Sequence, residues 1–277
     1  MMPFLRAAAA GALVACVAAE AAFAQAEVNI FSHREPGLIA PLLKAFSAKT
    51  GIKTNVVFAG AGLNELMDAE GALRPADLPF PVDAGRMSEA KEAGLARPVK
   101  SAALEVVPAA YRDADGHWCG LTMRACVIDA PKERMKQDTI TCGELSDPRW
   151  KGKLCTRPGQ HVYNTSLFAT VIAHKGEAAT ETWLKGVKAN LSREPTGDNR
   201  GQVCDVQTGP CELALGNTYY MAAMLKNPEQ KAWAGSAKII LPNAGDRGSH
   251  NQCLRRGACE ACQEQGRGHH IDGGPRG

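Results

Sequence analysis

Strand-like runs alternate with amphipathic helical runs from residue 27 onward, and this alternation restricts the chain to few folds. Glu27–Phe31 and Thr54–Phe58 are typical of strands, and a third strand is expected at Leu78–Val82. Between them, Pro36–Lys49 has helical periodicity and ends at Gly51, and a second helix is expected at Leu63–Ala72. The helical face of the first run comprises Leu38, Leu42, Leu43 and Phe46. This β-α-β-α-β order predicts an α/β lobe with a largely parallel sheet.

A second lobe is predicted from about Cys119. Strands are expected near Gly120–Ile128 and Lys153–Thr156, and helices near Ser166–Lys175 and Glu177–Ala189. We therefore expect a first α/β lobe at residues 25–118 and a second at residues 119–249. Two such lobes suggest a clamshell binder whose ligand lies where strand ends and helix N-termini line a cleft.

Residues 1–24 have the pattern of an export signal. Arg6 precedes an apolar run from Ala7 to Ala22, and Ala22-Phe23-Ala24 fits a small-x-small cleavage site. A membrane anchor is the alternative, but the run is short for a bilayer span and Glu20 interrupts it. We expect a mature chain that starts near Gln25, in the periplasm.

Cysteine usage agrees with an oxidising compartment. The chain has ten Cys, of which Cys16 belongs to the signal and three fall in the last 25 residues. Even pairing in an exported chain favours disulfides, and the short loops predict Cys142–Cys155 and Cys204–Cys211. Buried free thiols are the alternative. Cys119 and Cys126 flank an expected strand and are not assigned.

Composition and motif content exclude two function classes. Lys and Arg number 32 against 29 Asp and Glu, so no basic footprint for nucleic acid is present. The sequence has no G-x-S-x-G, no H-E-x-x-H and no paired acids at catalytic spacing. We therefore expect a non-enzymatic protein that does not bind nucleic acid.

Seven collinear stretches between about Val28 and His250 resemble the ferric-iron-binding proteins of bacterial ABC importers, a periplasmic Fe(III) substrate-binding family. They are Phe31-Ser32-His33-Arg34, Pro75-Ala76-Asp77 with Val82-Asp83-Ala84-Gly85-Arg86, Gly116-His117-Trp118-Cys119-Gly120-Leu121-Thr122, Leu145-Ser146-Asp147-Pro148-Arg149-Trp150-Lys151-Gly152, Gly159-Gln160-His161-Val162-Tyr163-Asn164, and Gly216-Asn217-Thr218-Tyr219-Tyr220. The resemblance implies a type II clamshell that closes on Fe(III) and delivers it to an inner-membrane ABC permease, with the protein expected to be a monomer.

Three of the four tyrosines fall in these motifs, namely Tyr163, Tyr219 and Tyr220. Fe(III) is a hard cation that prefers anionic oxygen donors, and a bound metal ion favours the deprotonated phenol. On a strand-to-helix turn, adjacent tyrosines could both reach a cleft. An ordinary half-buried tyrosine pair is the alternative. The resemblance favours metal ligation by all three phenols.

The first lobe offers His33 as a fourth ligand, because many relatives carry a Tyr or His just after the first strand and neutral imidazole can ligate iron. A surface His in a loop is the alternative. Arg34 and Arg124 are candidates to bind a synergistic anion such as carbonate, or to neutralise phenolate charge. A structural ion-pair role is as well supported for either arginine.

Two segments depart from the family pattern. Pro79 and Pro81 fall in the third expected strand, where loss of ladder hydrogen bonds predicts a weakened first lobe. After His250 the chain turns Gly-rich, and Leu254 and Ile271 are its only residues of the types Leu, Ile and Val.

Codons permitted for Asn251–Gly257, read one base later, encode Ile-Asn-Val-Ser-Gly-Ala, which resembles the family's continuation. A frameshift after about residue 250 is therefore expected, with residues 250–277 an aberrant, disordered tail and the family's C-terminal return segment missing. A zinc site from Cys253, Cys259, Cys262, His269 and His270 is the weaker alternative, because the spacing is loose.

The sequence therefore predicts an extracytoplasmic protein that captures Fe(III) in an interlobe cleft, with a synergistic anion such as carbonate as a candidate co-ligand, and whose function the altered tail impairs. The alternative is a clamshell for another small solute of an ABC importer, such as an organic cation, an oxyanion or a chelated metal.

Overall fold

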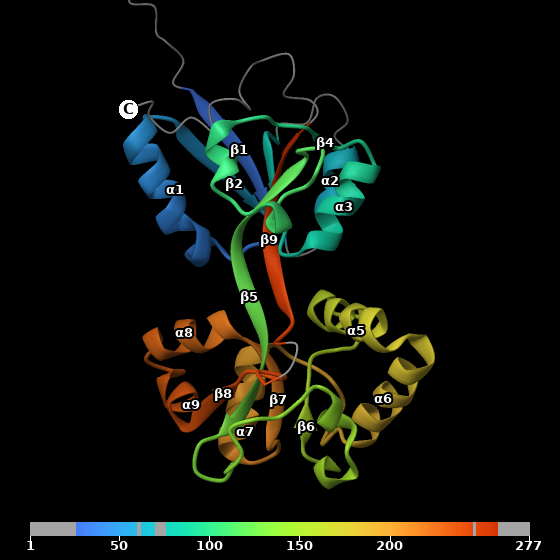
Figure 1. Cartoon of the computed structure of the whole chain (residues 1–277). Helices are drawn as coiled ribbons and strands as arrows, with labels where there is room; N and C mark the ends of the chain where they lie inside the picture. The colour runs from blue at the N-terminus through green and yellow to red at the C-terminus, as the bar shows by residue number, and fades with distance from the viewer. Residues whose placement is uncertain (1–25, 60–61, 70–75, 246–247, 260–277) are drawn as a thin grey trace, which may run out of the picture.

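Two lobes lie one above the other in the computed structural model, and the long strands β5 (Trp118–Pro131) and β9 (Asn251–Cys259) run between them (Figure 1). The structure describes residues 26–59, 62–69, 76–245 and 248–259. β5 and β9 are antiparallel partners along Trp118–Ala125, with a register irregularity between Gly120 and Thr122. This pair is the described connection about which the lobes can move.

The first lobe is built on a parallel three-stranded sheet in the order β2-β1-β3. Its elements are β1 (Glu27–Ser32), α1 (Pro36–Thr50), β2 (Lys53–Phe58), α2 (Leu63–Ala69), β3 (Leu78–Phe80), α3 (Ala84–Glu92), β4 (Ala96–Arg97), α4 (Ala102–Glu105) and the 3-10 helix η2 (Ala109–Tyr111). Their order confirms the predicted β-α-β-α-β alternation.

Helix α1 has the predicted limits, but its apolar face is only partly buried. Pro36 occupies the first turn and Gly51 ends the helix in the left-handed region, at φ 72°. Ile39 is buried and Leu43 packs against the same cluster. Leu42, which the periodicity places on the core side, is 52% exposed.

The prolines of the third strand are accommodated by its length and position. β3 spans three residues, with Pro79 opposite Phe31, and it ends before Pro81. Among the described strands of this sheet, β3 lies at one end of the order, where a residue without an N–H is tolerated. Leu78 and Phe80 are buried on either side of Pro79.

A mixed sheet of described order β4-β9-β5-β7-β6, with β8 also paired to β5, runs from β4 in the first lobe into the second lobe (Figure 1). The second lobe holds strands β6, β7 and β8 of this sheet (Figure 1). Its elements are η3 (Gly143–Ser146), η4 (Pro148–Trp150), β6 (Leu154–Cys155), α5 (Val162–Lys175), α6 (Glu177–Ala189), α7 (Asn199–Thr208), β7 (Leu213–Asn217), α8 (Thr218–Lys226), α9 (Lys231–Ser236) and β8 (Ala237–Ile240). β6 and β7 are parallel neighbours, whereas β5 is antiparallel to β7 and β8.

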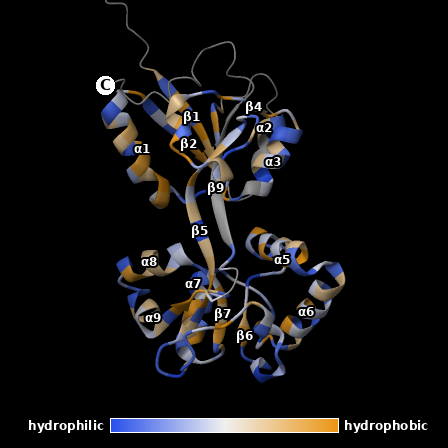
Figure 2. Cartoon of the chain, in the orientation of Figure 1, coloured by the Kyte–Doolittle hydropathy of each residue, from blue (hydrophilic) through white to orange (hydrophobic). Residues whose placement is uncertain are grey.

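The largest apolar cluster joins this sheet to helices α5 and α6. Fully buried members include Ile128 on β5, Leu154 on β6, Leu167 on α5 and Leu213 on β7. Figure 2 shows the apolar residues on the strands and inner helix faces of the second lobe, with polar residues outside. This packing fixes the ends of β6 and β7, from which the site residues extend.

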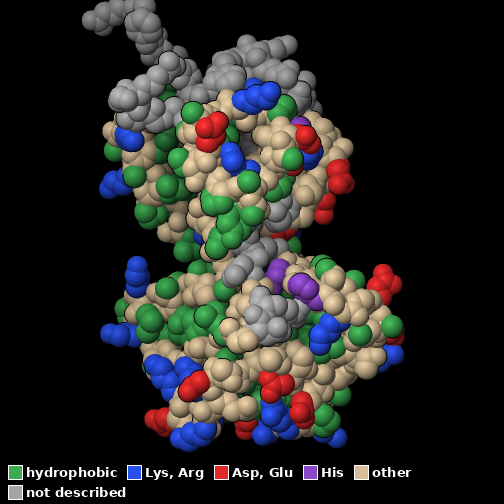
Figure 3. Space-filling model, viewed as in Figure 1, with side chains coloured by type: hydrophobic (Ala, Val, Ile, Leu, Met, Phe, Trp, Pro, Cys, Tyr) green, Lys and Arg blue, Asp and Glu red, His purple; other side chains and the backbone are tan. Residues whose placement is uncertain are grey.

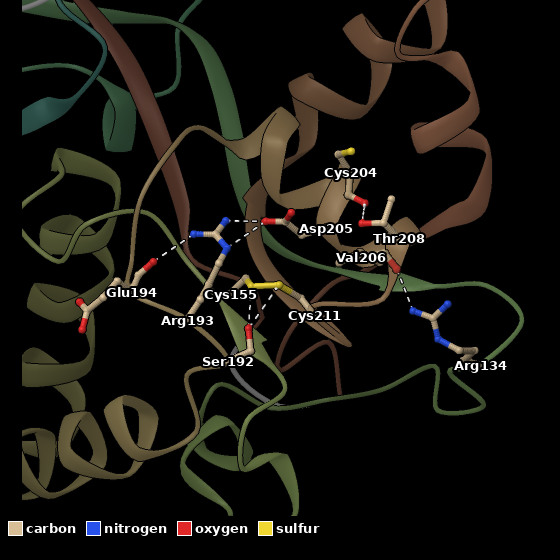
Figure 4. Close-up of a disulfide and its surroundings, with 10 residues drawn as sticks. All are labelled: Arg134, Cys155, Ser192, Arg193, Glu194, Cys204, Asp205, Val206, Thr208 and Cys211. Carbon is tan, nitrogen blue, oxygen red and sulfur yellow. Dashed lines mark hydrogen bonds and ion pairs between the residues drawn. A yellow bond between two sulfur atoms is a disulfide. The ribbon is translucent and has the colours of Figure 1, made fainter.

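The predicted disulfide pairing is wrong. The bond joins Cys155 to Cys211 (Figure 4), with Cα atoms 5.8 Å apart, because parallel pairing of β6 and β7 sets Cys155 opposite Ala214, close to Cys211. Cys142 is buried and Cys204 lies on α7, and neither belongs to a disulfide. The prediction paired cysteines that are close in the sequence, but the pairing of neighbouring strands decides which thiols lie together.

The chain after His250 is ordered further than predicted. Asn251–Cys259 form β9, which pairs with β5 and β4, so the expected disorder is wrong for these residues. The backbone there follows the open edge of β5, which offers unpaired amide groups to any extended segment. Residues 260–277, with Cys262, His269 and His270, lie outside the described residues, as does the predicted export signal. Within the described part, no helix is both long and apolar enough to cross a membrane.

Candidate metal centre

Three tyrosines reach one point from two neighbouring strand-to-helix turns. Tyr219 and Tyr220 lie in the first turn of α8, directly after β7 ends at Asn217. Tyr163 lies in the first turn of α5, which follows β6. Because β6 and β7 are parallel neighbours, their C-terminal ends share one edge of the sheet, where α/β proteins place ligands.

The phenol groups are in direct contact. The hydroxyl oxygens of Tyr163 and Tyr219 lie 2.9 Å apart. The rings of Tyr219 and Tyr220 have centroids 4.2 Å apart and are tilted by 32°. Tyr220 is buried, and Tyr163 and Tyr219 are partly buried. The two adjacent tyrosines therefore lie with Tyr163 at this edge of the sheet, and metal ligation by the three phenols stays a prediction.

Arginines cover the tyrosine rings. The Arg124 guanidinium lies 4.0 Å from the centre of the Tyr163 ring, with Arg157 at 5.3 Å from the same ring. Arg200 lies 4.8 Å from the centre of the Tyr220 ring. Such cation–π contacts stabilise by about 0.5–2 kcal/mol each. They also place positive charge where phenolates would form.

Burial keeps the Tyr219 and Tyr220 phenols protonated when no cation is bound. It raises the pKa of Tyr220 to about 12 and, together with the neighbouring Tyr163 and Tyr220, raises the pKa of Tyr219. A cation that binds as a phenolate complex must therefore displace protons. A trivalent ion offers the charge for this exchange.

Arg34 and Arg124 meet the tyrosines from the first lobe and the connecting strand. Arg34 Nη1 donates to Thr122 Oγ1 on β5 at 2.6 Å. Arg124 is buried on β5 and donates through Nη1 to Asn217 Oδ1, at the end of β7. Burial lowers the pKa of both arginines, while Tyr163 and Tyr219 act in the opposite direction, so both guanidiniums face these tyrosines.

The hydrogen bonding of the His33 ring differs from that expected of an iron ligand. It is 8% exposed, and its Nδ1 lies 3.5 Å from Arg86 Nη1. Burial, and next Arg86, lower the pKa of His33 to about 4, so the ring is neutral near pH 7. Since arginine only donates, Nδ1 accepts and Nε2 carries the proton. Ligation through Nε2 would require the proton to move to Nδ1.

Three buried donor nitrogens, two on arginines near the tyrosines and one on His33 of the first lobe, have no protein acceptor among the described residues. They are His33 Nε2, Arg34 Nε and Arg157 Nε. Buried donors without acceptors are rare in folded proteins and are costly. The arrangement therefore fits an anionic ligand atom in this region, beside the phenol oxygens.

Three residues near the tyrosines, His161, Arg157 and Arg200, were not singled out from the sequence. His161 caps α5, where its Nδ1 accepts from the Tyr163 backbone N–H at 3.2 Å, and its ring meets the Tyr163 ring edge-on. Burial, and next Arg157, lower the pKa of His161 to about 4. The Gly159–Asn164 motif already contained His161, whereas Arg157 precedes it and gave no signal.

Two other groups have the composition of metal sites but have other partners. Asp113, Asp115 and His117 cluster in the first lobe, where the Lys91 ammonium contacts both carboxylates. Asp205 lies beside the Cys155–Cys211 disulfide and pairs with Arg193 (Figure 4). Neither cluster competes with the tyrosines as a site for a hard cation. Figure 3 shows acidic and basic side chains interspersed over the visible faces of both lobes.

Comparison with known proteins identifies the family. A family model described as bacterial extracellular solute-binding protein matches residues 75–246. The chain belongs to this family. It is 40% identical, over 231 residues, to Iron uptake protein A1 of Synechocystis sp.; the match covers 82% of this chain and 64% of that relative. The chain thus spans less than two thirds of the length of this relative.

Solved structures share the type II clamshell fold. Apo ferric ion-binding protein A of Pasteurella haemolytica matches with a TM-score of 0.83 and 39% identity, over 89% of this chain and 80% of that chain. A Trichodesmium protein in complex with iron and citrate ligands matches with a TM-score of 0.81 and 33% identity, over 89% and 79% of the two chains. The predicted fold class is confirmed for this member of the extracellular solute-binding family.

Proposed function

We propose that this protein captures Fe(III) between its lobes with the phenolates of Tyr163, Tyr219 and Tyr220 and delivers it to an ABC permease. The observation that carries the proposal is the 2.9 Å contact between the hydroxyls of Tyr163 and Tyr219, with Tyr220 stacked beside them. Phenolate oxygen is a hard anionic donor, which suits a hard trivalent cation. The relatives with iron or ferric binding in their names support this choice of ion.

The charges around the site favour an accompanying anion. Three phenolates offset the charge of one Fe(III) ion, so Arg34 and Arg124 retain positive charge beside the complex. An anion such as carbonate would accept hydrogen bonds from these guanidiniums, with Arg34 Nε as one available donor. His33 contributes either as a fourth ligand, after the proton moves from Nε2, or as a donor to the anion.

Export, location and partners belong to the same proposal. Residues 1–24 act as an export signal, the mature monomer works in the periplasm, and the loaded clamshell docks on an inner-membrane permease. We assign it no catalytic reaction, because the site offers binding groups arranged for one ion. The names of relatives such as the Fe(3+)-binding periplasmic protein of Serratia marcescens support this location.

The arginines also favour a second candidate, a binder of a colourless organic anion or oxyanion. Arg34, Arg124, Arg157 and Arg200 gather around the tyrosine cluster. Such a cluster alone would attract a polyanion. The two candidates differ in optical absorption, because Fe(III)–phenolate complexes absorb visible light.

The test is titration of the metal-free protein with ferric citrate while visible absorbance is recorded. We expect a charge-transfer band that is lost in the Tyr219→Phe/Tyr220→Phe double variant and kept in Tyr111→Phe. Tyr111 is a suitable control because it lies on η2 of the first lobe, away from the cluster. Full absorbance in the double variant would remove the tyrosines from the site. A colourless wild type that binds citrate alone by calorimetry would favour the second candidate.

A further inference from the structure

An ion pair joins the two lobes directly. Glu35 lies between β1 and α1 of the first lobe, and Arg200 lies in the first turn of α7 of the second lobe. Arg200 Nη2 donates to Glu35 Oε2 at 2.8 Å, and Nη1 donates to Oε1 at 3.3 Å. The Arg200 side chain is 22% exposed, and the Glu35 side chain is 44% exposed. This fork-to-fork geometry is the stronger form of an arginine–carboxylate contact.

Both ends of this pair are attached to the candidate metal centre. Glu35 follows His33 and Arg34 in one short segment after β1. On the other side, the Arg200 guanidinium that binds Glu35 also lies 4.8 Å from the centre of the Tyr220 ring. The ion pair therefore connects the first-lobe segment to a tyrosine of the second lobe.

We propose that Glu35 and Arg200 form an interlobe clasp that slows release of the ion, and that the Arg200 guanidinium by itself positions the Tyr220 ring. This inference rests on the proposed function, since it concerns regulation of the same site. Opening about β5 and β9 must separate the two side chains, because they belong to different lobes. The clasp therefore raises the population of the closed form, and apparent affinity scales with that population.

Arg200 keeps a carboxylate partner when the clasp opens. Asp198 Oδ2, at the start of the same helix, lies 3.6 Å from Arg200 Nη1. Part of the Coulomb energy of the clasp is thereby retained in the open form. The partial exposure of both groups also weakens the pair by solvent screening. A moderate effect on release follows, rather than an irreversible lock.

The first experiment measures iron release from the loaded protein into excess chelator. We expect Glu35→Gln to release iron about three to ten times faster than wild type with an unchanged charge-transfer band, because the tyrosines keep their contacts. Glu212→Gln is the matched control, since Glu212 pairs with Lys153 inside the second lobe. It should release iron at the wild-type rate.

Salt separates the clasp from a general loss of stability. Release from wild type should accelerate between about 0.05 M and about 0.5 M NaCl, whereas release from Glu35→Gln should change much less. Arg200→Gln should release faster than Glu35→Gln and also shift the band, because it removes the cation from the Tyr220 ring. Equal rates and equal salt dependence in wild type and Glu35→Gln, with normal colour in both, would overturn the clasp while leaving the iron site in place.

Small-angle X-ray scattering gives a readout that does not need iron. The metal-free Glu35→Gln protein should have a larger radius of gyration than metal-free wild type, because its lobes open more often. An unchanged radius would contradict the clasp. A wild type that never becomes coloured would count against the proposed function instead, and the scattering comparison would still test the clasp.

Discussion

The hydroxyl oxygens of Tyr163 and Tyr219 lie 2.9 Å apart, although 56 residues separate them in the sequence. Parallel pairing of β6 and β7 makes this contact, because both tyrosines extend from the same edge of the sheet. Only one proton can lie between the two oxygens, so one phenol donates and the other accepts. A cation in that position would replace the shared proton.

Removing the Tyr163 hydroxyl should weaken iron binding with little effect on folding. Tyr163→Phe keeps the ring on which the Arg124 guanidinium lies, so it removes only the oxygen. We expect iron affinity to fall by at least about tenfold, which is the lower range for loss of even an outer partner in metal sites. Loss of one hydrogen bond costs only about 1 kcal/mol of unfolding free energy.

Chelator competition and thermal unfolding of Tyr163→Phe check both parts of this prediction. Tyr163→Ala serves for comparison, because it also removes the Arg124 contact and should lower the melting temperature further. Iron affinity equal to wild type in Tyr163→Phe would show that this phenol is not a ligand.

Most strands and helices follow from the sequence because their apolar runs match their final environment. The limits of α6 agree with prediction to the residue, and β1 differs by one. β5 is harder, because one strand serves both lobes and therefore changes its buried face along its length. Helix α5 begins earlier than predicted because His161, an unusual cap, supplies the acceptor for its first turn.

The tyrosines of the candidate site can be predicted from the sequence, whereas the residues around them are harder to predict. The tyrosines fall in motifs, and β7 places Tyr219 and Tyr220 where the motif implies. The arginines come from separate elements, namely β5 for Arg124 and α7 for Arg200, so only the fold brings them together. The orientation of His33 depends on Arg86 of α3, and no spacing in the sequence encodes that contact.

The disulfide between Cys155 and Cys211 should be the one present in oxidised protein. Peptide mapping without reduction should recover these two residues in one cross-linked fragment, with Cys142 and Cys204 alkylated as free thiols after denaturation. Cys211→Ala should lower the unfolding free energy by about 2–4 kcal/mol, because the bond closes a long loop. Cys204→Ala, which removes a free thiol, is the control and should unfold near the wild-type midpoint. Recovery of a Cys204–Cys211 fragment would contradict the structure.

Two glycines of the second lobe should respond to alanine with opposite signs. A Cβ on Gly216 would lie 2.1 Å from Asp129 Oδ2 and 3.1 Å from its Cγ, whereas a Cβ on Gly235 would meet nothing within 4 Å. Gly216→Ala should therefore cost about 1–3 kcal/mol, since the buried Asp129 must move. Gly235→Ala should gain up to about 1 kcal/mol, because Gly235 lies inside α9.

Urea denaturation of both alanine variants gives the comparison. A Gly216→Ala variant that is as stable as wild type would show that the Asp129 side chain has room to move. Combining Gly216→Ala with Asp129→Ala should recover much of the loss, because the smaller side chain vacates the contact.

The buried carboxyl of Asp129 should make stability fall as pH rises. Asp129 is 4% exposed on β5, and burial raises its pKa from 3.8 to about 7. Between these pH values the folded state holds a proton that the unfolded state has released. The free energy of unfolding therefore falls as pH rises from about 4 to about 7, and this contribution is constant above that range. Asp129→Asn removes the proton exchange, so wild type should lose up to about 4 kcal/mol relative to the variant over this range.

Urea unfolding at a series of pH values measures this difference, with the profile of Asp129→Asn subtracted from that of wild type. Asp138→Asn is the matched control, because the Asp138 side chain is 87% exposed. Parallel profiles for wild type and Asp129→Asn between about pH 4 and about pH 7 would mean that Asp129 ionises without cost in the folded state.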